Sequence, residues 1–243
     1  MKLQILAIAA HPDDIELSCS GTLIKHAQMG QAIGIVDLTR GELGTRGTPE
    51  LRIEESADAA KLMGVAVREN ANMRDGFFKN DEEHQLRIIT YIRAYQPDII
   101  IANALADRHP DHGRAGRLVA DSCFLAGLRK VATIWEGKEQ QPWRPKRVFH
   151  MIQDRFAEPS FVVDISIAFT KKMEAIQCYK SQFHDPLSKE PQTYLTTAQF
   201  LKNIEGRDAL MGKRIGVTYG EGFTSENIPG ISNLDSLLLP GLP

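Results

Sequence analysis

Two short clusters of histidine and aspartate carry the chemistry that this 243-residue sequence could perform. Both contain a His-Pro-Asp sequence, and together they supply His11, Asp13, Asp14, His109, Asp111 and His112. Imidazole nitrogens and carboxylate oxygens are good zinc ligands, and a catalytic zinc site uses three protein ligands plus water. The clusters hold more groups than three ligands require, so the surplus could serve as a general base and an electrostatic stabiliser.

Each cluster follows an apolar segment that we expect to be a buried strand. Residues 3–10 form an almost unbroken apolar run, and residues 98–103 form another. Such runs are typical of strands covered on both faces in a parallel sheet. Ligands bind beyond the carboxyl ends of strands in these sheets, so we expect the clusters to converge. A single His-Pro-Asp is often only a turn, but two of them after buried strands favour a shared metal site. Spacing alone does not say which side chains are ligands.

Strands and helices are expected to alternate through roughly the first 130 residues. The expected strands are 3–10, 32–39, 65–70 and 98–103, and the expected helices are 16–29, 50–63, 81–95 and 113–128. This alternation predicts an α/β fold with a Rossmann-like, mostly parallel sheet flanked by helices.

The remainder, 131–243, is less regular. Strands are expected at 147–153 and 161–165, helices at 166–181 and 193–211, and an irregular tail from 216. We expect residues 1–243 to form a single domain, with the α/β core in about the first 130 residues.

Composition excludes several other classes of protein. The formal net charge is -2 and no long basic run is present, so no nucleic-acid partner is expected. No stretch reaches the ~20 apolar residues of a membrane span. Cys19, Cys123 and Cys178 form no CxxC pair, which argues against a thiolate metal site and favours a reducing, cytoplasmic location. The GxSxG, P-loop, GxGxxG and HExxH motifs are missing from the sequence.

The paired motifs AHPDD (10–14) and HPDH (109–112) resemble those of the LmbE-like (PIG-L) family of zinc-dependent N-acetylglucosamine deacetylases. The segments LTRGELGTRGTPELRIEE (38–55) and YGEGF (219–223) are similar to the branch that deacetylates N-acetylglucosaminyl-malate in bacillithiol biosynthesis. The resemblance covers nearly the whole chain. It implies a hydrolase that uses Zn²⁺ to remove the N-acetyl group from a small-molecule sugar conjugate. One departure is Ile15, where many members carry glutamate.

The resemblance also implies roles for the clustered residues. By motif position, His11, Asp14 and His112 match the zinc ligands. Asp13 matches the general base that activates the attacking water. His109 matches the residue that stabilises the oxyanion or protonates the leaving amine.

Predicted roles also extend to four residues besides the three ligands, the base and His109. Asp111 is expected to orient a histidine without being a metal ligand itself. Arg52 matches an arginine that binds sugar hydroxyls, and it could equally be a charge on a helix surface. Tyr194 matches a tyrosine that helps to bind the oxyanion. His184, which stands next to Asp185 and Pro186, could serve as a reserve ligand or a substrate contact.

Several alternatives remain open at this point. A mixed nitrogen and oxygen site also accommodates Fe²⁺. The substrate could be a chito-oligosaccharide or a thiol conjugate of the mycothiol type, with the same metal site. A non-catalytic sugar-binding or metal-binding module is a third possibility, although a pure binder has no need of a spare base. The sequence leaves open whether the chain forms a homo-oligomer.

Overall fold

The computed structural model describes residues 1–183 and 189–239 of the chain. Within these residues a central sheet has the strand order β3-β2-β1-β4-β7-β9-β8. Its strands are β1 (Ile5–Ala9), β2 (Ile33–Asp37), β3 (Val67–Asn70), β4 (Ile99–Ala102), β7 (Arg147–Met151), β8 (Phe161–Asp164) and β9 (Gly220–Thr224). The first five strands in this order are parallel, and β9 runs antiparallel to both of its neighbours, β7 and β8. A separate hairpin pairs β5 (Ile134–Trp135) with β6 (Lys138–Glu139).

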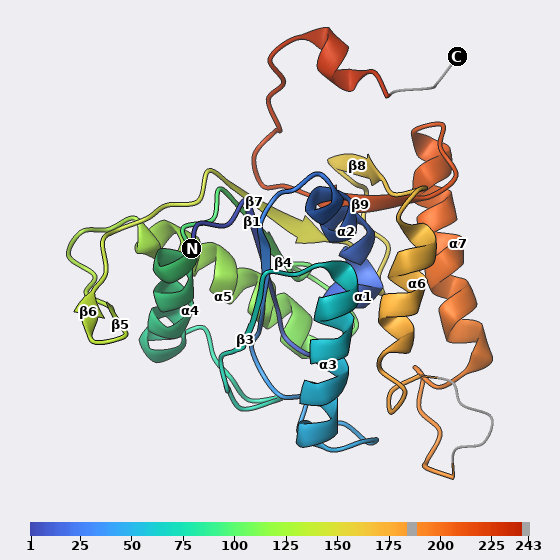
Figure 1. Cartoon of the computed structure of the whole chain (residues 1–243), viewed down its shortest axis with the longest axis horizontal. Helices are drawn as coiled ribbons and strands as arrows, with labels where there is room; N and C mark the ends of the chain where they lie inside the picture. The colour runs from blue at the N-terminus through green and yellow to red at the C-terminus, as the bar shows by residue number, and fades with distance from the viewer. Residues whose placement is uncertain (184–188, 240–243) are drawn as a thin grey trace.

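Helices cover both faces of the central sheet (Figure 1). They are α1 (Asp14–Ser18), α2 (Ser20–Gln28), α3 (Pro49–Met63), α4 (Glu82–Tyr95), α5 (Pro110–Ala126), α6 (Phe169–Gln177) and α7 (Ala198–Arg214), with a 3₁₀ turn η1 (Leu234–Leu237) near the end. α4 and α5 lie on one face, and α1, α2, α3 and α6 lie on the other, while α7 packs against β9. Across the described ranges, none of the helices has the length and apolar character needed to cross a membrane.

The side chains of β1 explain why helices cover both faces. Leu6 and Ile8 are fully buried in a core cluster that includes apolar residues of α4 and α5. Ile5 and Ala7 point the other way, into a cluster with residues of α2, α3 and α6. Successive residues of a strand face opposite sides, so a continuous apolar run fits only a two-sided interior. The predicted Rossmann-like α/β fold is therefore confirmed.

Several of the predicted helices have different bounds in the structure, and two of these follow the histidine clusters. The segment expected as one helix at 16–29 is divided at Cys19, whose φ of -145° is not helical. The hydroxyl of Ser20 donates to the carbonyl of Glu16, a contact that bends helices. The helix expected from 113 already begins at Pro110, because proline suits the first helical position. As a result, His112 lies inside the first turn of α5.

The prediction of an irregular tail from 216 is wrong for β9. This strand lies between β7 and β8 within the sheet. Its glycines make the position possible: a Cβ on Gly220 would lie 2.6 Å from Val162 Cγ1, and one on Gly222 would lie 3.0 Å from Met211 Sδ. A glycine-rich composition therefore reflects close packing here rather than a loop.

A buried ion cluster ties β9 to the helices around it. Lys172 Nζ of α6 lies 2.6 Å from Asp208 Oδ2 of α7 and 2.8 Å from Glu221 Oε1 of β9. All three side chains are at most 1% exposed. The carboxylate of Glu221 also accepts hydrogen bonds from the backbone N–H groups of Gly21 and Thr22 in α2. The cluster thus joins the second half of the chain to α2, the second of the two helices after the AHPDD loop.

We predict that Lys172→Met destabilises the protein by about 3–5 kcal/mol, because it removes the buried ammonium that pairs with both carboxylates. For a chain of this size the loss corresponds to a melting temperature lower by roughly 6–20 °C. Differential scanning calorimetry measures it directly. The neighbouring Lys171→Met is the matched control, with an expected effect within about 0.5 kcal/mol. Equal melting temperatures for the two variants would contradict the role of the cluster.

Candidate metal and active site

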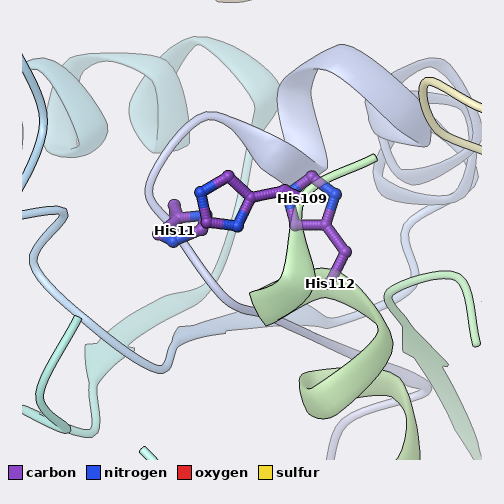
Figure 2. Close-up of side chains that lie close together, drawn as sticks. All are labelled: His11, His109 and His112. Atoms are coloured by element: carbon purple, nitrogen blue, oxygen red, sulfur yellow. The ribbon is translucent and has the colours of Figure 1, made fainter. Parts of the chain in front are cut away.

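The loops after β1 and β4 meet at one edge of the sheet. The two strands are parallel neighbours, with Ile8 opposite Ala102, so their carboxyl ends lie side by side. His11 lies just after β1, His109 is the N-cap of α5, and His112 is in the first turn of that helix. Figure 2 shows the three imidazoles close together, with the ring centroid of His11 4.8 Å from that of His109 and 5.7 Å from that of His112. The structure therefore brings the two sequence clusters to one place.

The carboxylate of Asp14 lies between two of these imidazoles. Its Oδ2 is 3.6 Å from His11 Nδ1, and its Oδ1 is 3.0 Å from His112 Nε2. The side-chain amides of Asn103 and Gln153 donate to the same carboxylate at 3.0 and 3.3 Å. Burial alone would raise the pKa of Asp14, but His112 and His11 outweigh it and hold this pKa well below its ordinary value. Asp14 is accordingly ionised and held by four neighbours.

The far nitrogens of the same two histidines are held by other carboxylates. His112 Nδ1 lies 2.6 Å from Asp107 Oδ2. His11 Nε2 lies 3.1 Å from Asp75 Oδ1 and 3.4 Å from Asp111 Oδ2. A carboxylate that hydrogen-bonds to one ring nitrogen of a histidine fixes the orientation of the imidazole, so that its other nitrogen can bind a metal. His11 Nδ1 and His112 Nε2 are left facing Asp14, which makes a donor set of two imidazoles and one carboxylate.

His109 is the third imidazole, and its hydrogen bonding suits it to donation. Its Nδ1 accepts a hydrogen bond from the backbone N–H of Asp111 at 3.2 Å. Burial, together with the charges of His11 and His112, lowers the pKa of His109. A neutral imidazole whose Nδ1 accepts must carry its proton on Nε2, where it can be donated.

Among the residues that the structure describes, two groups of side chains place possible ligand atoms within 4.8 Å of one another: His11, His109 and His112, and His11, Asp75 and Asp111. In the first group the Nε2 proton of His109 opposes ligation, and Asp14 takes its place. In the second group the carboxylates face His11 Nε2, and Asp111 already accepts hydrogen bonds from Gly76 and Arg114. Chemistry therefore favours His11, Asp14 and His112, a donor set that fits a catalytic zinc site.

Asp13 differs sharply from its neighbour Asp14. Its φ of 105° lies in the left-handed region that non-glycine residues rarely adopt. Its side chain is buried, and its Oδ2 lies 3.0 Å from Arg52 Nη2. Burial raises the pKa of Asp13 to about 7, although Arg52 opposes the shift. Two adjacent carboxylates with separated pKa values are typical of a division of roles in catalysis.

A cavity of about 900 Å³ opens over these residues and contains the remaining predicted contacts. Arg52 and Tyr194 both line it. Arg52 is directed at Asp13, as described above. The hydroxyl of Tyr194 donates to Asp154 at 2.9 Å, and the guanidinium of Arg108 covers its ring at 4.7 Å. His184 lies outside the residues that the structure describes.

Sequence reasoning missed four residues that support the site: Asp75, Asn103, Asp107 and Gln153. Asn103 directly follows β4 and Gln153 comes two residues after β7, so a polar residue near the end of a strand was the available signal. Asp107 stands five residues before His112, within the same polar segment. Asp75 stands in an Asp-Gly turn far from either cluster, and only the tertiary fold brings it to His11.

The fold and the site define an α/β enzyme whose candidate metal site lies beyond the carboxyl ends of its parallel strands. Residues 6–123 match the family model PIG-L, described as GlcNAc-PI de-N-acetylase. The chain belongs to this PIG-L (LmbE-like) deacetylase family and is an enzyme of its metal-dependent class.

Individual relatives support this membership over most of the chain. An uncharacterized deacetylase from Escherichia coli is 30% identical over 73% of this chain and 90% of its own length. Diacetylchitobiose deacetylase from Thermococcus kodakarensis is 27% identical over 94% of this chain and 84% of its own length. The crystal structure of a conserved protein from Thermus thermophilus is similar with a TM-score of 0.85 and 34% identity, covering 96% of this chain and 98% of that one.

The relatives differ in what they are named for. A probable N-acetyl-alpha-D-glucosaminyl L-malate deacetylase from Bacillus anthracis is 24% identical over 78% of this chain and 86% of its own length. A 4-oxalmesaconate hydratase from Pseudomonas putida is 26% identical over 74% of each chain. The family therefore spans several substrates, and membership alone does not select one.

We predict that Asp107→Asn weakens zinc binding by about 10–100-fold, because His112 loses the carboxylate that orients its ring. Competition with a chromophoric chelator measures the dissociation constant. The control is Asp121→Asn on α5, the helix that carries His112, because the carboxylate of Asp121 instead accepts from Asn80. Unchanged affinity in the Asp107 variant would argue against this support.

Proposed function

We propose that the chain is a zinc-dependent hydrolase that removes the N-acetyl group from an N-acetylglucosamine conjugate. The observation that carries the proposal is the carboxylate of Asp14 between His11 and His112, with the buried Asp13 beside it. A metal site alone would need only the first three side chains. The additional carboxylate in the same loop favours an enzyme over a binding module.

His11, Asp14 and His112 are the residues that would hold the zinc ion. Zinc in such a site lowers the pKa of water toward ~7 and polarises a carbonyl oxygen. Asn103 and Gln153 keep the carboxylate of Asp14 in position through their amide hydrogens.

The protein's own groups perform the proton transfers. Asp13 takes a proton from the attacking water, and the resulting hydroxide adds to the amide carbon of the acetyl group. A carboxylate with a pKa near the operating pH suits this role. His109 donates its Nε2 hydrogen bond to the developing oxyanion, an interaction of about 3–4 kcal/mol in comparable sites. The proton that Asp13 took from water then passes to the leaving amine, so that acetate and a free amino sugar remain and His109 stays neutral.

The substrate we propose is N-acetylglucosaminyl-malate, in bacillithiol biosynthesis. Support comes from the segment 38–55, because Leu43, Gly44, Thr45 and Arg46 of this segment line the cavity. The second similar segment, 219–223, contributes little to this choice, since β9 and the buried Glu221 belong to the sheet. The diacetylchitobiose relative, which matches more of the chain, keeps chito-oligosaccharides as the competing substrate.

We predict that Asp13→Asn lowers kcat by about 10²–10⁴-fold while zinc remains bound, because the variant loses its base and keeps its ligands. His11→Ala should instead lose the metal. Elemental analysis and acetate release separate the two outcomes. Activity near that of the wild type in the Asp13 variant would show that the base is elsewhere.

Acetate release with and without a chelator tests the proposed reaction. We expect release from N-acetylglucosaminyl-malate to stop when zinc is removed and to return when it is restored. Parallel kinetics on N-acetylglucosamine and diacetylchitobiose rank the substrates. Absence of acetate from all three substrates with zinc bound would contradict the proposed function and favour a binding module or a hydratase.

A further inference from the structure

The backbone at Asp13 is strained, and something must hold it there. With φ 105° and ψ -26°, Asp13 occupies a conformation that L-residues rarely adopt. Such a residue costs on the order of 1–3 kcal/mol and persists only when its surroundings impose the conformation. The strain lies at the residue proposed as the base, where the direction of the carboxylate decides the chemistry.

Arg52 contacts this turn at the strained residue and at the residue before it. Its Nη2 donates to the carbonyl oxygen of Pro12 and to the carboxylate of Asp13. Its Nη1 donates to the carbonyl of Gly41 at 3.4 Å. The side chain is 6% exposed and comes from α3, a helix capped by Thr48 at its start and Gly64 at its end. A single rigid group therefore connects the AHPDD loop to a separate helix.

The loop at Gly41 is shaped around the same guanidinium. A Cβ on Gly41 would lie 1.9 Å from Arg52 Nη1 and 2.6 Å from its Cζ. Gly41 also has φ +65°, a conformation that favours glycine. Only a residue without a side chain allows the guanidinium to occupy this position.

The donors of Arg52 are nearly all committed within the protein. A guanidinium has five N–H groups: one on Nε and two on each Nη. Both hydrogens of Nη2 are used by Pro12 and Asp13, and one hydrogen of Nη1 is used by Gly41. The Nε group is buried without a hydrogen-bond partner among the described residues, and so cannot reach a ligand in the cavity. At most one N–H group remains for a sugar hydroxyl.

We propose that Arg52 is a positioning residue that holds the strained turn and the carboxylate of Asp13 in place, rather than a primary sugar ligand. This inference rests on the proposed function insofar as Asp13 is the base. Without Arg52, the turn relaxes toward ordinary φ values and the carboxylate leaves its place. A displacement of about 1 Å in a catalytic group can cost on the order of 10²-fold in rate.

The two roles predict opposite kinetics for Arg52→Gln. A positioning residue predicts a kcat lower by about 10²-fold with little change in KM, whereas a sugar ligand predicts a raised KM with kcat retained. Arg52→Lys keeps the positive charge but lacks the planar guanidinium that donates to two acceptors at once. The kcat of this variant should therefore stay close to that of the Gln variant. Lys61→Gln, an exposed change on the same helix, is the control. Zinc content and thermal melting show that each variant is folded and loaded.

The crystal structure of Arg52→Gln, or of Arg52→Lys if the first does not fold, tests the inference without any substrate. We expect the φ of Asp13 to leave the left-handed region and its carboxylate to turn away. An unchanged Asp13 in that structure, or a raised KM with kcat retained, would overturn the inference. If the wild-type enzyme released no acetate from any N-acetyl sugar, the proposed function would fail, while the structure of the variant would still decide the role of Arg52.

Discussion

The carboxylate of Asp14 is the point at which the sheet, the loops and the histidines of this protein meet. Its oxygens face His11 and His112 and accept hydrogen bonds from Asn103 and Gln153. These partners follow β1, β4 and β7, or lie in the helix after β4, so three consecutive strands of the sheet contribute to one charged group. The parallel arrangement is therefore a requirement of the site, because only parallel neighbours present their carboxyl ends at the same edge.

The sequence places two aspartates side by side, and the fold gives them opposite surroundings. Despite its burial, Asp14 has a pKa held well below its ordinary value by His112 and His11, whereas burial raises the pKa of Asp13 to about 7. The two side chains also have different partners, because Asp13 contacts Arg52 and Asp14 contacts the two imidazoles. A ligand must remain charged, and a base must accept a proton near neutral pH, so this separation supplies both kinds of carboxylate from one short loop.

Much of this arrangement could be predicted from the sequence. The apolar runs before each His-Pro-Asp identify β1 and β4, and the helix that ends at Gly64 was predicted to within one residue. Hydrophobic periodicity and composition could not predict β9, because Gly220 and Gly222 are typical of a loop. Only the tertiary structure shows the close contacts that require glycine there. Asp75 reaches His11 across 64 positions, and Arg52 reaches Asp13 across 39. Contacts of this range depend on tertiary packing, which leaves no local pattern in the chain.

The central claim is that His11, Asp14 and His112 together hold a metal ion. Anomalous diffraction at the zinc absorption edge, from crystals of the zinc-loaded protein, tests it most directly. We predict one strong anomalous peak within bonding distance of His11 Nδ1, an oxygen of Asp14 and His112 Nε2, with His109 free to donate from Nε2. A peak between His11 Nε2, Asp75 and Asp111, or one next to His109 in place of Asp14, would contradict this ligand set.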